Sequence, residues 1–379
     1  MRFVTDFPGG NGKCIRSEEF DWGWEIEFLA QCKAREPQPL WFFFRLEELT
    51  GEKVRIKLAN SDQCLCPDPW IDNHPVCRQE NGEWQRVEKV EEWWTESHRL
   101  ETWFEIPLTG STLEFAFCYP YQEAQLMKTL EECPVFKKEI IGYSAMERPI
   151  WRVYNAIGKA AKDKPGVYFL ARQHSGEVTG TWVMDGILRY LSSPEGRELL
   201  ERFNWWFVPM VDVDGVEEGF YGKDQIWNDL NRAWHPHFPL RPELVAVQRD
   251  LCFFHEHCGG KMMLDLHGPA HRERDCYFTV AYKTNDEHRA QLRSICAGIN
   301  RSLDKCGRQH VGFIEKQAGS NTSSQNGMMG AAYARYIGMN GCALEISYQG
   351  ERCGYNYEIS DYRRLGEAVA KAVADMLAK

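Results

Sequence analysis

The sequence predicts an α/β protein in which a mixed sheet is flanked by helices (residues 123–379), preceded by an antiparallel β-sandwich (residues 1–122). Three observations predict this fold class. Short aromatic and β-branched runs separated by turn residues fill the first part, as in sandwiches. Apolar runs alternate with helix-period segments in the second part, as in layered α/β proteins. The length of 379 residues also suits two domains.

Five runs in the first part are expected to form strands, and no helix of comparable length competes with them. They are rich in Trp, Phe, Ile and Val and cover residues 22–28, 40–46, 54–58, 102–106 and 113–117. Gly-rich or polar turn segments, such as 8–12 and 109–111, lie between them. This alternation of short strands and turns favours an antiparallel sandwich.

Four continuous apolar runs mark expected strands of the second part, at residues 167–171, 205–211, 262–266 and 342–346. Such runs indicate strands that are covered on both faces. Segments 181–191 and 362–377 instead place their apolar residues on one face at helical spacing. We therefore expect helices packed on both faces of a central sheet.

Composition narrows the class of protein. The 55 acidic side chains exceed the 45 basic ones, which argues against a nucleic-acid or anionic-membrane partner. The N-terminal residues lack the apolar core of a secretory signal, and no apolar run is long enough to span a bilayer. The 14 cysteines are scattered, so we expect reduced thiols in a cytoplasmic protein and a structural role for Cys64 and Cys66.

Polar residues that apolar packing does not explain stand at the expected strands of the second part. They are His174 and Glu177 after the first strand, Asp212 and Asp214 after the second, His267 after the third and Glu345 within the fourth. Ligands of open α/β sheets bind beyond the carboxyl ends of the strands. The sequence therefore predicts a functional site at that edge.

Three of these residues could hold one zinc ion. His174 and Glu177 lie three residues apart on an expected strand-to-helix turn, and His267 also ends a strand. Catalytic zinc usually takes three protein ligands, often two His and one Glu, and keeps a position for water. The alternative is that each histidine is a hydrogen-bonded structural residue, which is the more frequent case for a single His near a strand end.

Four other histidines are not expected to bind the metal. His255 and His257 look like a ligand pair, but their segment precedes a strand and falls on the opposite edge of the sheet. His235 and His237 lie in a polar segment. We expect all four to be structural or solvated.

Glu345 is a carboxylate inside an apolar run. A buried, unpaired carboxylate costs several kcal/mol, so it needs a cationic partner or a function. Beside a zinc site it would suit a general base. A salt bridge to an arginine is the alternative.

The segment 228–234 offers groups for binding a carboxylate. The amide of Asn231 and the guanidinium of Arg232 stand side by side and can hold a carboxylate by bidentate hydrogen bonds. Asp229 could orient a ligating histidine. An ordinary polar loop is the alternative.

Taken in order, segment 140–150, His174 to Glu177, Asn231-Arg232, His267-Gly268 and Glu345 resemble the M14 zinc carboxypeptidases over residues 135–379. Segments 41–45 and 115–121 are similar to the sandwich that precedes the catalytic domain in the cytosolic carboxypeptidase subfamily.

The resemblance implies a zinc peptidase with one Zn²⁺ per chain. His174, Glu177 and His267 would be its ligands and Glu345 its base. Asn231 and Arg232 would grip the terminal carboxylate of a peptide or protein tail, and Asp229 would support His174.

The chain departs from the family pattern at three places. Lys223 is the only cation between residues 216 and 230, where family members usually carry an arginine that polarises the scissile carbonyl. Residues 309–330 contain no tyrosine, and Tyr333 and Tyr336 fall on an expected helix. Segment 326–330 lacks the arginine of the deglutamylating members. We assign the oxyanion-stabilising role to Lys223, with a solvated loop lysine as the alternative.

The predicted function is hydrolysis of a C-terminal peptide or amide bond by metal-activated water. Two alternatives stay open. One is a zinc amidohydrolase or deacylase that acts on small amino-acid conjugates. The other is a catalytically inactive binding protein of the same fold.

Overall fold

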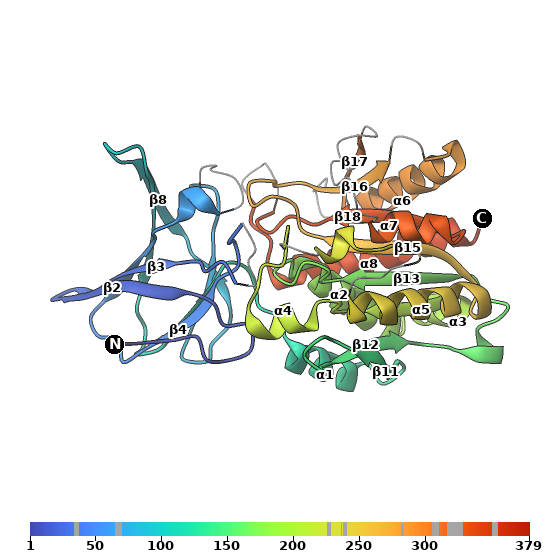
Figure 1. Cartoon of the computed structure of the whole chain (residues 1–379), viewed down its shortest axis with the longest axis horizontal. Coiled ribbons are helices and arrows are strands. Elements are labelled where there is room, and N and C mark those ends of the chain that lie inside the picture. The colour runs from blue at the N-terminus through green and yellow to red at the C-terminus, as the bar shows by residue number, and fades with distance from the viewer. Residues whose placement is uncertain are drawn as a thin grey trace.

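The computed structural model describes residues 1–33, 38–64, 70–225, 229–235, 237, 241–281, 284–304, 311–316, 329–350 and 355–379. Strands of the first part lie together at the left of Figure 1, and the helices and the large sheet of the second part lie at the right. The architecture is a mixed α/β domain preceded by a β-domain, which confirms the predicted fold class.

Two five-stranded sheets form the first part, with strand orders β1-β4-β10-β6-β7 and β2-β3-β5-β9-β8. Their strands are β1 (Arg2–Val4), β2 (Lys13–Phe20), β3 (Gly23–Leu29), β4 (Phe43–Glu47), β5 (Lys53–Leu58), β6 (Val76–Gln79), β7 (Gln85–Arg86), β8 (Lys89–Trp94), β9 (Leu100–Pro107) and β10 (Leu113–Ala116), with a short 3-10 helix η1 (Ser61–Gln63).

One pair in these sheets is not antiparallel. Strands β3 and β5 run parallel, with Trp24 opposite Val54 and Phe28 opposite Leu58. The intervening strand β4 belongs to the other sheet, so the chain crosses over and returns beside β3 in the same direction. This pair departs from the antiparallel pairing of the predicted sandwich, which the other strand pairs of the two sheets follow.

An eight-stranded sheet forms the second part, in the order β11-β12-β14-β13-β15-β18-β16-β17. Its strands are β11 (Lys137–Tyr143), β12 (Pro149–Tyr154), β13 (Gly166–Ala171), β14 (Asn204–Val208), β15 (Gly260–His267), β16 (Cys276–Ala281), β17 (Val311–Lys316) and β18 (Asn340–Glu345). The four central strands β14, β13, β15 and β18 are mutually parallel.

The helices follow the alternation that the sequence predicted. They are α1 (Glu123–Glu132), α2 (Thr179–Ser192), α3 (Arg197–Arg202), α4 (Val213–Glu218), α5 (Pro242–His257), α6 (Asp286–Asp304), α7 (Gly330–Tyr336) and α8 (Ile359–Leu377), with the 3-10 turns η2 (Gly158–Ala160) and η3 (Leu230–Arg232). One expected strand is shorter than predicted. The run 205–211 stops as a strand at Val208 because Pro209 has no N–H for the ladder.

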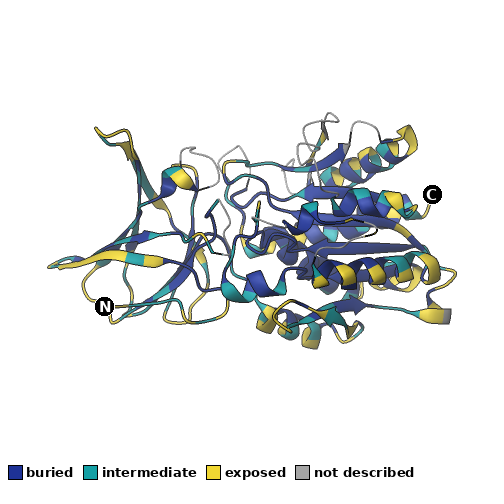
Figure 2. Cartoon of the chain, in the orientation of Figure 1, coloured by how far each residue is buried: buried dark blue, intermediate teal, exposed yellow. Residues whose placement is uncertain are grey.

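Alternate residues of the central strands pack into two separate cores. Phe169 and Leu264 join the core that contains α2, α6 and α8, whereas Tyr168 and Met263 join the core that contains α5 and α7. This is the consequence of the two-residue period of a strand. The sheet is therefore covered on both faces, and it is the dark band at the centre of the right half of Figure 2.

Buried polar contacts join the two parts. Asn11 is fully buried, and its Nδ2 donates to the Gly219 carbonyl at 2.8 Å. The indole of Trp182 on α2 donates to the Tyr119 carbonyl at 2.9 Å.

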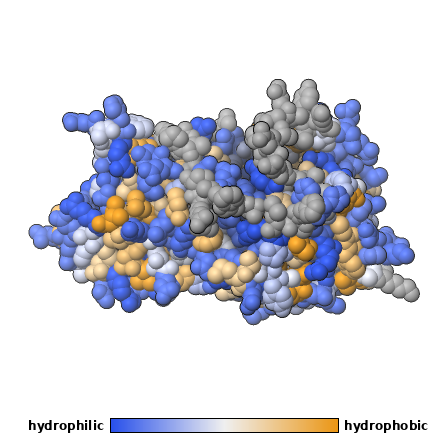
Figure 3. All heavy atoms as spheres, in the orientation of Figure 1, coloured by the Kyte–Doolittle hydropathy of each residue, from blue (hydrophilic) through white to orange (hydrophobic). Residues whose placement is uncertain are grey.

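On the face shown in Figure 3, hydrophobic residues lie in small groups among hydrophilic ones. Among the described helices, none is both long and apolar enough to cross a membrane.

Candidate metal centre

Three side chains that could bind a metal meet where β13 and β15 end. The two strands are parallel neighbours, with Ala171 opposite Leu266. His174 therefore follows one strand end close to His267 at the other, and Glu177 stands just before α2. Their ligand atoms all lie within 4.8 Å of one another, and the three side chains are at most 3% exposed. The three residues that the sequence proposed as zinc ligands therefore lie together at this edge of the sheet.

Each histidine presents the same nitrogen to Glu177. His174 Nδ1 lies 2.8 Å from Glu177 Oε1, and His267 Nδ1 lies 2.8 Å from Glu177 Oε2. The opposite nitrogens contact carboxylates, because His174 Nε2 lies 3.1 Å from Asp229 Oδ1 and His267 Nε2 lies 3.1 Å from Asp265 Oδ2. A carboxylate on Nε2 fixes the tautomer that leaves Nδ1 free to bind a metal. Both rings are thus oriented as ligands.

Sequence reasoning assigned no role to Asp265. Asp265 and His267 are two residues apart on β15, so they share one face of the strand. The Asp265 carboxylate also accepts from Gln173 Nε2 at 2.6 Å, and the Trp234 indole donates to Gln173 Oε1 at 2.5 Å. The two-residue spacing before a candidate ligand was the signal that could have identified it.

The buried charges of the cluster shift one another. Burial by itself would lower the pKa of His174, but the carboxylates of Glu177 and Asp229 outweigh it and raise that pKa to about 9. Burial likewise opposes ionisation of Glu177, yet His174, Lys223 and His267 hold the pKa of its carboxyl well below the ordinary value. Without a metal, the cluster therefore consists of the Glu177 carboxylate between the cationic side chains of His174, His267 and Lys223.

Lys223 lies beside the cluster. Its Nζ donates to Glu177 Oε1 at 3.0 Å and to the Gly268 carbonyl at 3.2 Å, and its side chain is 20% exposed. Burial favours the neutral amine, but the nearby Glu177 and Glu345 outweigh it and raise the pKa of Lys223 well above its usual value. Lys223 is therefore a fixed cation at the site and not a solvated loop lysine.

Glu345 ends β18, opposite His267 in the parallel pair with β15. Its Oε2 is buried and has no hydrogen-bond partner in the described part of the chain. The alternative for this carboxylate was a salt bridge to an arginine, which would have given Oε2 a hydrogen-bond partner. A buried acceptor without a partner suits a group that takes up a proton.

Tyr277 on β16 lies opposite Glu345 on the other side, and sequence reasoning missed it. Burial and the Glu345 carboxylate raise the pKa of its hydroxyl, which therefore keeps its proton at neutral pH. The only hint in the sequence was an aromatic residue in a strand that follows His267, which is too common a feature to mark a site.

The turn η3 brings the remaining candidates to the cluster. Asp229 caps it by accepting from the Asn231 backbone N–H at 2.7 Å. Asn231 Nδ2 lies 3.1 Å from His267 Nε2, and Arg232 Nη1 donates to the Asn231 carbonyl at 2.9 Å. Asn228, at the start of the same segment, lies outside the described residues, as do most of 309–330 and Cys66.

Other candidates have structural contacts. Asp212 caps α4 by accepting from the Gly215 N–H at 3.1 Å, and Asp214 accepts from the Ser144 hydroxyl at 2.6 Å. His255 Nδ1 contacts the Gly260 carbonyl at 3.1 Å in the last turn of α5, away from the strand ends that carry the cluster. Within the described residues, none of these three side chains belongs to a group that could hold a metal.

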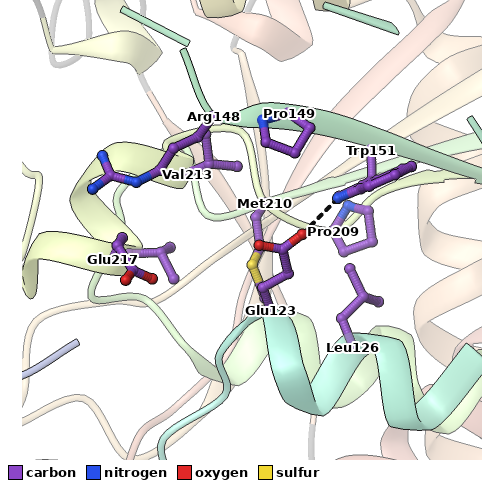
Figure 4. Close-up of a pocket in the computed structure, with 10 residues that line it drawn as sticks. Glu123, Leu126, Arg148, Pro149, Trp151, Pro209, Met210, Val213 and Glu217 are labelled. Carbon is purple, nitrogen blue, oxygen red and sulfur yellow. Dashed lines mark hydrogen bonds between the residues drawn. The ribbon is translucent and has the colours of Figure 1, made fainter. Parts of the chain in front are cut away.

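A separate pocket lies between α1, β12 and α4 (Figure 4). The Trp151 indole donates to Glu123 Oε1 at 2.7 Å across one side of it. Its volume of about 20 Å³ is close to that of a single water molecule. It is too small for a substrate and is not the candidate site.

Family models match both parts of the chain. A zinc carboxypeptidase model of the M14 type matches residues 123–238, which include His174, Glu177 and the Asn231-Arg232 pair. Over these residues the chain is similar to the M14 zinc carboxypeptidases. A model of the cytosolic carboxypeptidase N-terminal domain matches residues 3–118, which confirms the resemblance of the first part to that subfamily.

Curated relatives carry cytosolic carboxypeptidase names. The chain is 27% identical over 266 residues to cytosolic carboxypeptidase 2 of Danio rerio, covering 62% of this chain and 36% of the relative. It is 25% identical over 304 residues to cytosolic carboxypeptidase 6 of Caenorhabditis elegans, covering 73% of this chain and 63% of the relative. The match therefore spans less than two thirds of either relative.

Solved structures share the fold along the whole chain. A metallo-carboxypeptidase from Burkholderia cenocepacia has a TM-score of 0.81 at 18% identity, covering 100% of this chain and 99% of the other. A metallo-carboxypeptidase from Pseudomonas aeruginosa, in complex with (2-guanidinoethylmercapto)succinic acid, has a TM-score of 0.80 at 20% identity, with 100% of both chains covered. At this identity the likeness establishes the fold.

Proposed function

We propose that this protein is a zinc-dependent carboxypeptidase that removes residues from the C-terminus of a peptide or protein tail. The observation that carries the proposal is the buried set of His174, Glu177 and His267, in which each histidine has its Nε2 against a carboxylate. Two imidazoles and one carboxylate are the donor set of many catalytic zinc sites.

The donor set fits zinc in its chemistry as well as its spacing. The two Nδ1 atoms and Glu177 face one another, so one cation would replace the hydrogen bonds that now join them. A bound Zn²⁺ would supply Lewis-acid chemistry, lowering the pKa of water and polarising the scissile carbonyl. Asp229 and Asp265 would hold the rings in place.

Glu345 is proposed as the general base. Its buried Oε2 has no hydrogen-bond partner among the described residues, and the strand register places it beside His267. It would take a proton from the attacking water and later pass it to the leaving amine. Lys223 would stabilise negative charge that builds on the carbonyl oxygen. Its raised pKa keeps it charged for that role.

Asn231 and Arg232 are proposed to bind the terminal carboxylate of the substrate. Because His267 donates its Nε2 proton to Asp265, that nitrogen does not accept a hydrogen bond from Asn231 Nδ2. The amide N–H groups of Asn231 then become available to a ligand. Arg232 supplies a charge beside them, which makes the pair selective for an anion.

The test of the function is hydrolysis of a peptide library with varied C-termini, with and without a zinc chelator. Small acyl-amino acids are assayed in parallel, because cleavage of these alone would favour the amidohydrolase alternative. We expect chelator-sensitive release of C-terminal residues from peptides. Absence of turnover on both substrate classes by the zinc-loaded protein would favour an inactive binding protein.

Glu345→Gln separates chemistry from structure. We expect the variant to keep its fold and its zinc while kcat falls by about 10²–10⁴, the usual contribution of a general base. Metal analysis and circular dichroism provide the controls. If the variant instead unfolds in part while its folded molecules keep normal activity, Glu345 has a structural role.

The cytoplasmic location and the absence of a nucleic-acid partner stay predictions.

A further inference from the structure

Another pocket, lined by polar side chains, lies at the opposite end of β18 from Glu345. It has a volume of about 430 Å³, and its lining includes Thr284, His288, Arg335 and Asn340. Asn340 begins β18 and Glu345 ends it, so the pocket is separated from the metal centre by about 17 Å of strand at 3.3 Å per residue. The pocket is therefore distinct from the proposed active site.

Arg335 brings a positive charge to this pocket, and no carboxylate among the described residues balances it. It stands in the last turn of α7, and its Nη1 donates to the Gly341 carbonyl at 2.6 Å. Burial lowers the pKa of its guanidinium, and no acidic residue among those described counteracts the shift. A partly buried arginine that has only a backbone carbonyl as partner can still offer most of its five N–H donors.

Two buried side chains of the same pocket lack partners. Thr284 Oγ1 and His288 Nδ1 have no hydrogen-bond partner in the part of the chain that the structure describes. Thr284 is 8% exposed and His288 is 1% exposed. A buried hydroxyl and a buried ring nitrogen that are left unsatisfied are costly unless a ligand meets them. Both line the same cavity as Arg335.

The pocket also lies at the N-terminus of α6, a helix of 19 residues. Asn285 precedes the helix, and its Oδ1 accepts from the His288 backbone N–H at 2.8 Å. The positive end of a helix dipole favours negative charge. Asp286 and Glu287 occupy the first turn, but they are exposed and are not part of the lining. Arg335 is the charged side chain of the lining, and the helix end adds to its positive potential.

We propose that this pocket binds a small oxyanion, a phosphate or carboxylate group, held by Arg335, Thr284 and His288. Arg335 would donate charge-assisted hydrogen bonds to the anion, and the Thr284 hydroxyl would donate a further one. The volume leaves room for a small organic molecule that carries the anionic group. The site goes beyond the proposed peptidase activity and does not depend on it.

His288 links this binding to a proton. Its Nε2 donates to the Gly341 carbonyl at 3.2 Å, so Nδ1 of the neutral ring is unprotonated. Burial and the charge of Arg335 hold its pKa below the ordinary value, while Gly341 and Gln291 act in the opposite direction. A bound anion favours the protonated ring. Affinity for the anion should therefore rise as pH falls.

The experiment is calorimetric titration of the zinc-loaded full chain with inorganic phosphate and, separately, with citrate, at constant ionic strength. The two ligands distinguish a phosphate-selective from a carboxylate-selective site. Arg335→Met is expected to weaken binding by about 10- to 100-fold, the usual effect of losing charge-assisted hydrogen bonds. Arg335→Lys should retain part of the affinity. Thr284→Val should lose less than Arg335→Met.

Arg249→Met is the matched control. Arg249 also donates to a backbone carbonyl, that of Ile141 at 3.0 Å, but it is exposed on α5 and does not line the pocket. We expect the Arg249→Met variant to bind both anions with the same affinity as the unaltered chain. His288→Gln should remove the increase in affinity at low pH. Thermal unfolding without ligand checks that each variant folds.

Equal anion affinity for Arg335→Met and the unaltered chain would overturn the proposal, because the anion would then bind elsewhere, for instance at the zinc. Absence of measurable binding of both anions to the unaltered chain would overturn it as well. If Arg335→Met does not fold, Thr284→Val and His288→Gln decide the question by the same comparison.

Discussion

At the scale of single residues, Lys223 shows how one contact changes an interpretation. The sequence left a solvated loop lysine and an oxyanion-stabilising cation as equal readings. Its Nζ lies 3.0 Å from Glu177 Oε1, so it is held at the metal cluster. The same contact would give it a second effect, because it also balances the negative charge of Glu177, a proposed metal ligand.

Lys223→Ala is expected to lower kcat by about 10²–10³ with a smaller change in KM, as for the loss of an oxyanion donor. Lys223→Arg should keep a substantial part of the activity, because the charge remains. Steady-state kinetics on a C-terminal peptide measure both, and zinc content is determined in parallel. Normal turnover by Lys223→Ala would show that another group stabilises the oxyanion.

Zinc binding should release protons at pH 7. The pKa of His174 in the metal-free protein is about 9, so this ring is protonated before a metal binds and must lose its proton to become a ligand. Titration calorimetry in buffers of different ionisation enthalpy gives the number of protons released. A release of zero protons would contradict the assigned ligand.

The same group predicts how the metal-free protein responds to pH. The folded-state pKa of His174 is raised from 6.5 to about 9, so its contribution to the free energy of unfolding is full below pH 6.5 and is lost as pH rises through 9. Thermal unfolding of the metal-free chain across this range should show the decline. His257→Gln, an exposed histidine on α5, should leave the profile unchanged.

At the scale of elements, two glycines set how closely α2 and α8 pack. A Cβ on Gly366 would lie 2.2 Å from the Val183 carbonyl oxygen, and one on Gly186 would lie 2.3 Å from the Arg363 carbonyl oxygen. Both contacts are with backbone, which cannot move aside cheaply. The two helices cover the sheet face beside the strand ends that carry the site.

Gly366→Ala is expected to lower the free energy of unfolding by about 1–3 kcal/mol, the usual cost of overpacking. Gly312→Ala on β17 is the matched control, because its added Cβ would meet the nearest side-chain atom at an ordinary 3.5 Å. Urea unfolding of the zinc-loaded chain measures both. Equal midpoints for Gly366→Ala and the unaltered chain would mean that the helices move apart without cost.

At the scale of the whole molecule, Arg86 connects the β-domain to the α/β domain. Its guanidinium donates to the carbonyls of His74 at 2.9 Å, Tyr348 at 2.7 Å and Tyr357 at 2.9 Å. His74 belongs to the first part and the two tyrosines to the second. Tyr348 follows Glu345 by three residues, so this junction also supports the segment that leaves the proposed active site.

Arg86→Leu should therefore destabilise the protein by about 2–4 kcal/mol, because buried carbonyls lose a charged donor. Arg78→Leu is the control: Arg78 pairs with Glu114 inside the first part, is partly exposed and should have a small effect. Denaturant unfolding followed by tryptophan fluorescence measures both. A loss for Arg86→Leu no larger than that for Arg78→Leu would rule out this junction as a stabilising contact.

The sequence by itself determined the two-part architecture and the central strands, and it singled out the three residues that the structure brings together at the strand ends. These follow from local patterns, since strand period and the polar residues at strand ends are set by neighbours in the chain. It did not determine that β3 and β5 are parallel, because strand partners depend on which sheet β4 joins.

Only the tertiary structure decided which groups meet from distant segments. Asp265 against His267 Nε2, Lys223 against Glu177 and Tyr277 beside Glu345 are contacts or pairings of this kind. A carboxylate, an ammonium or a phenol is common along any chain. Its chemical role depends on burial and on the atom it faces, and both are fixed only when the strands and turns pack together.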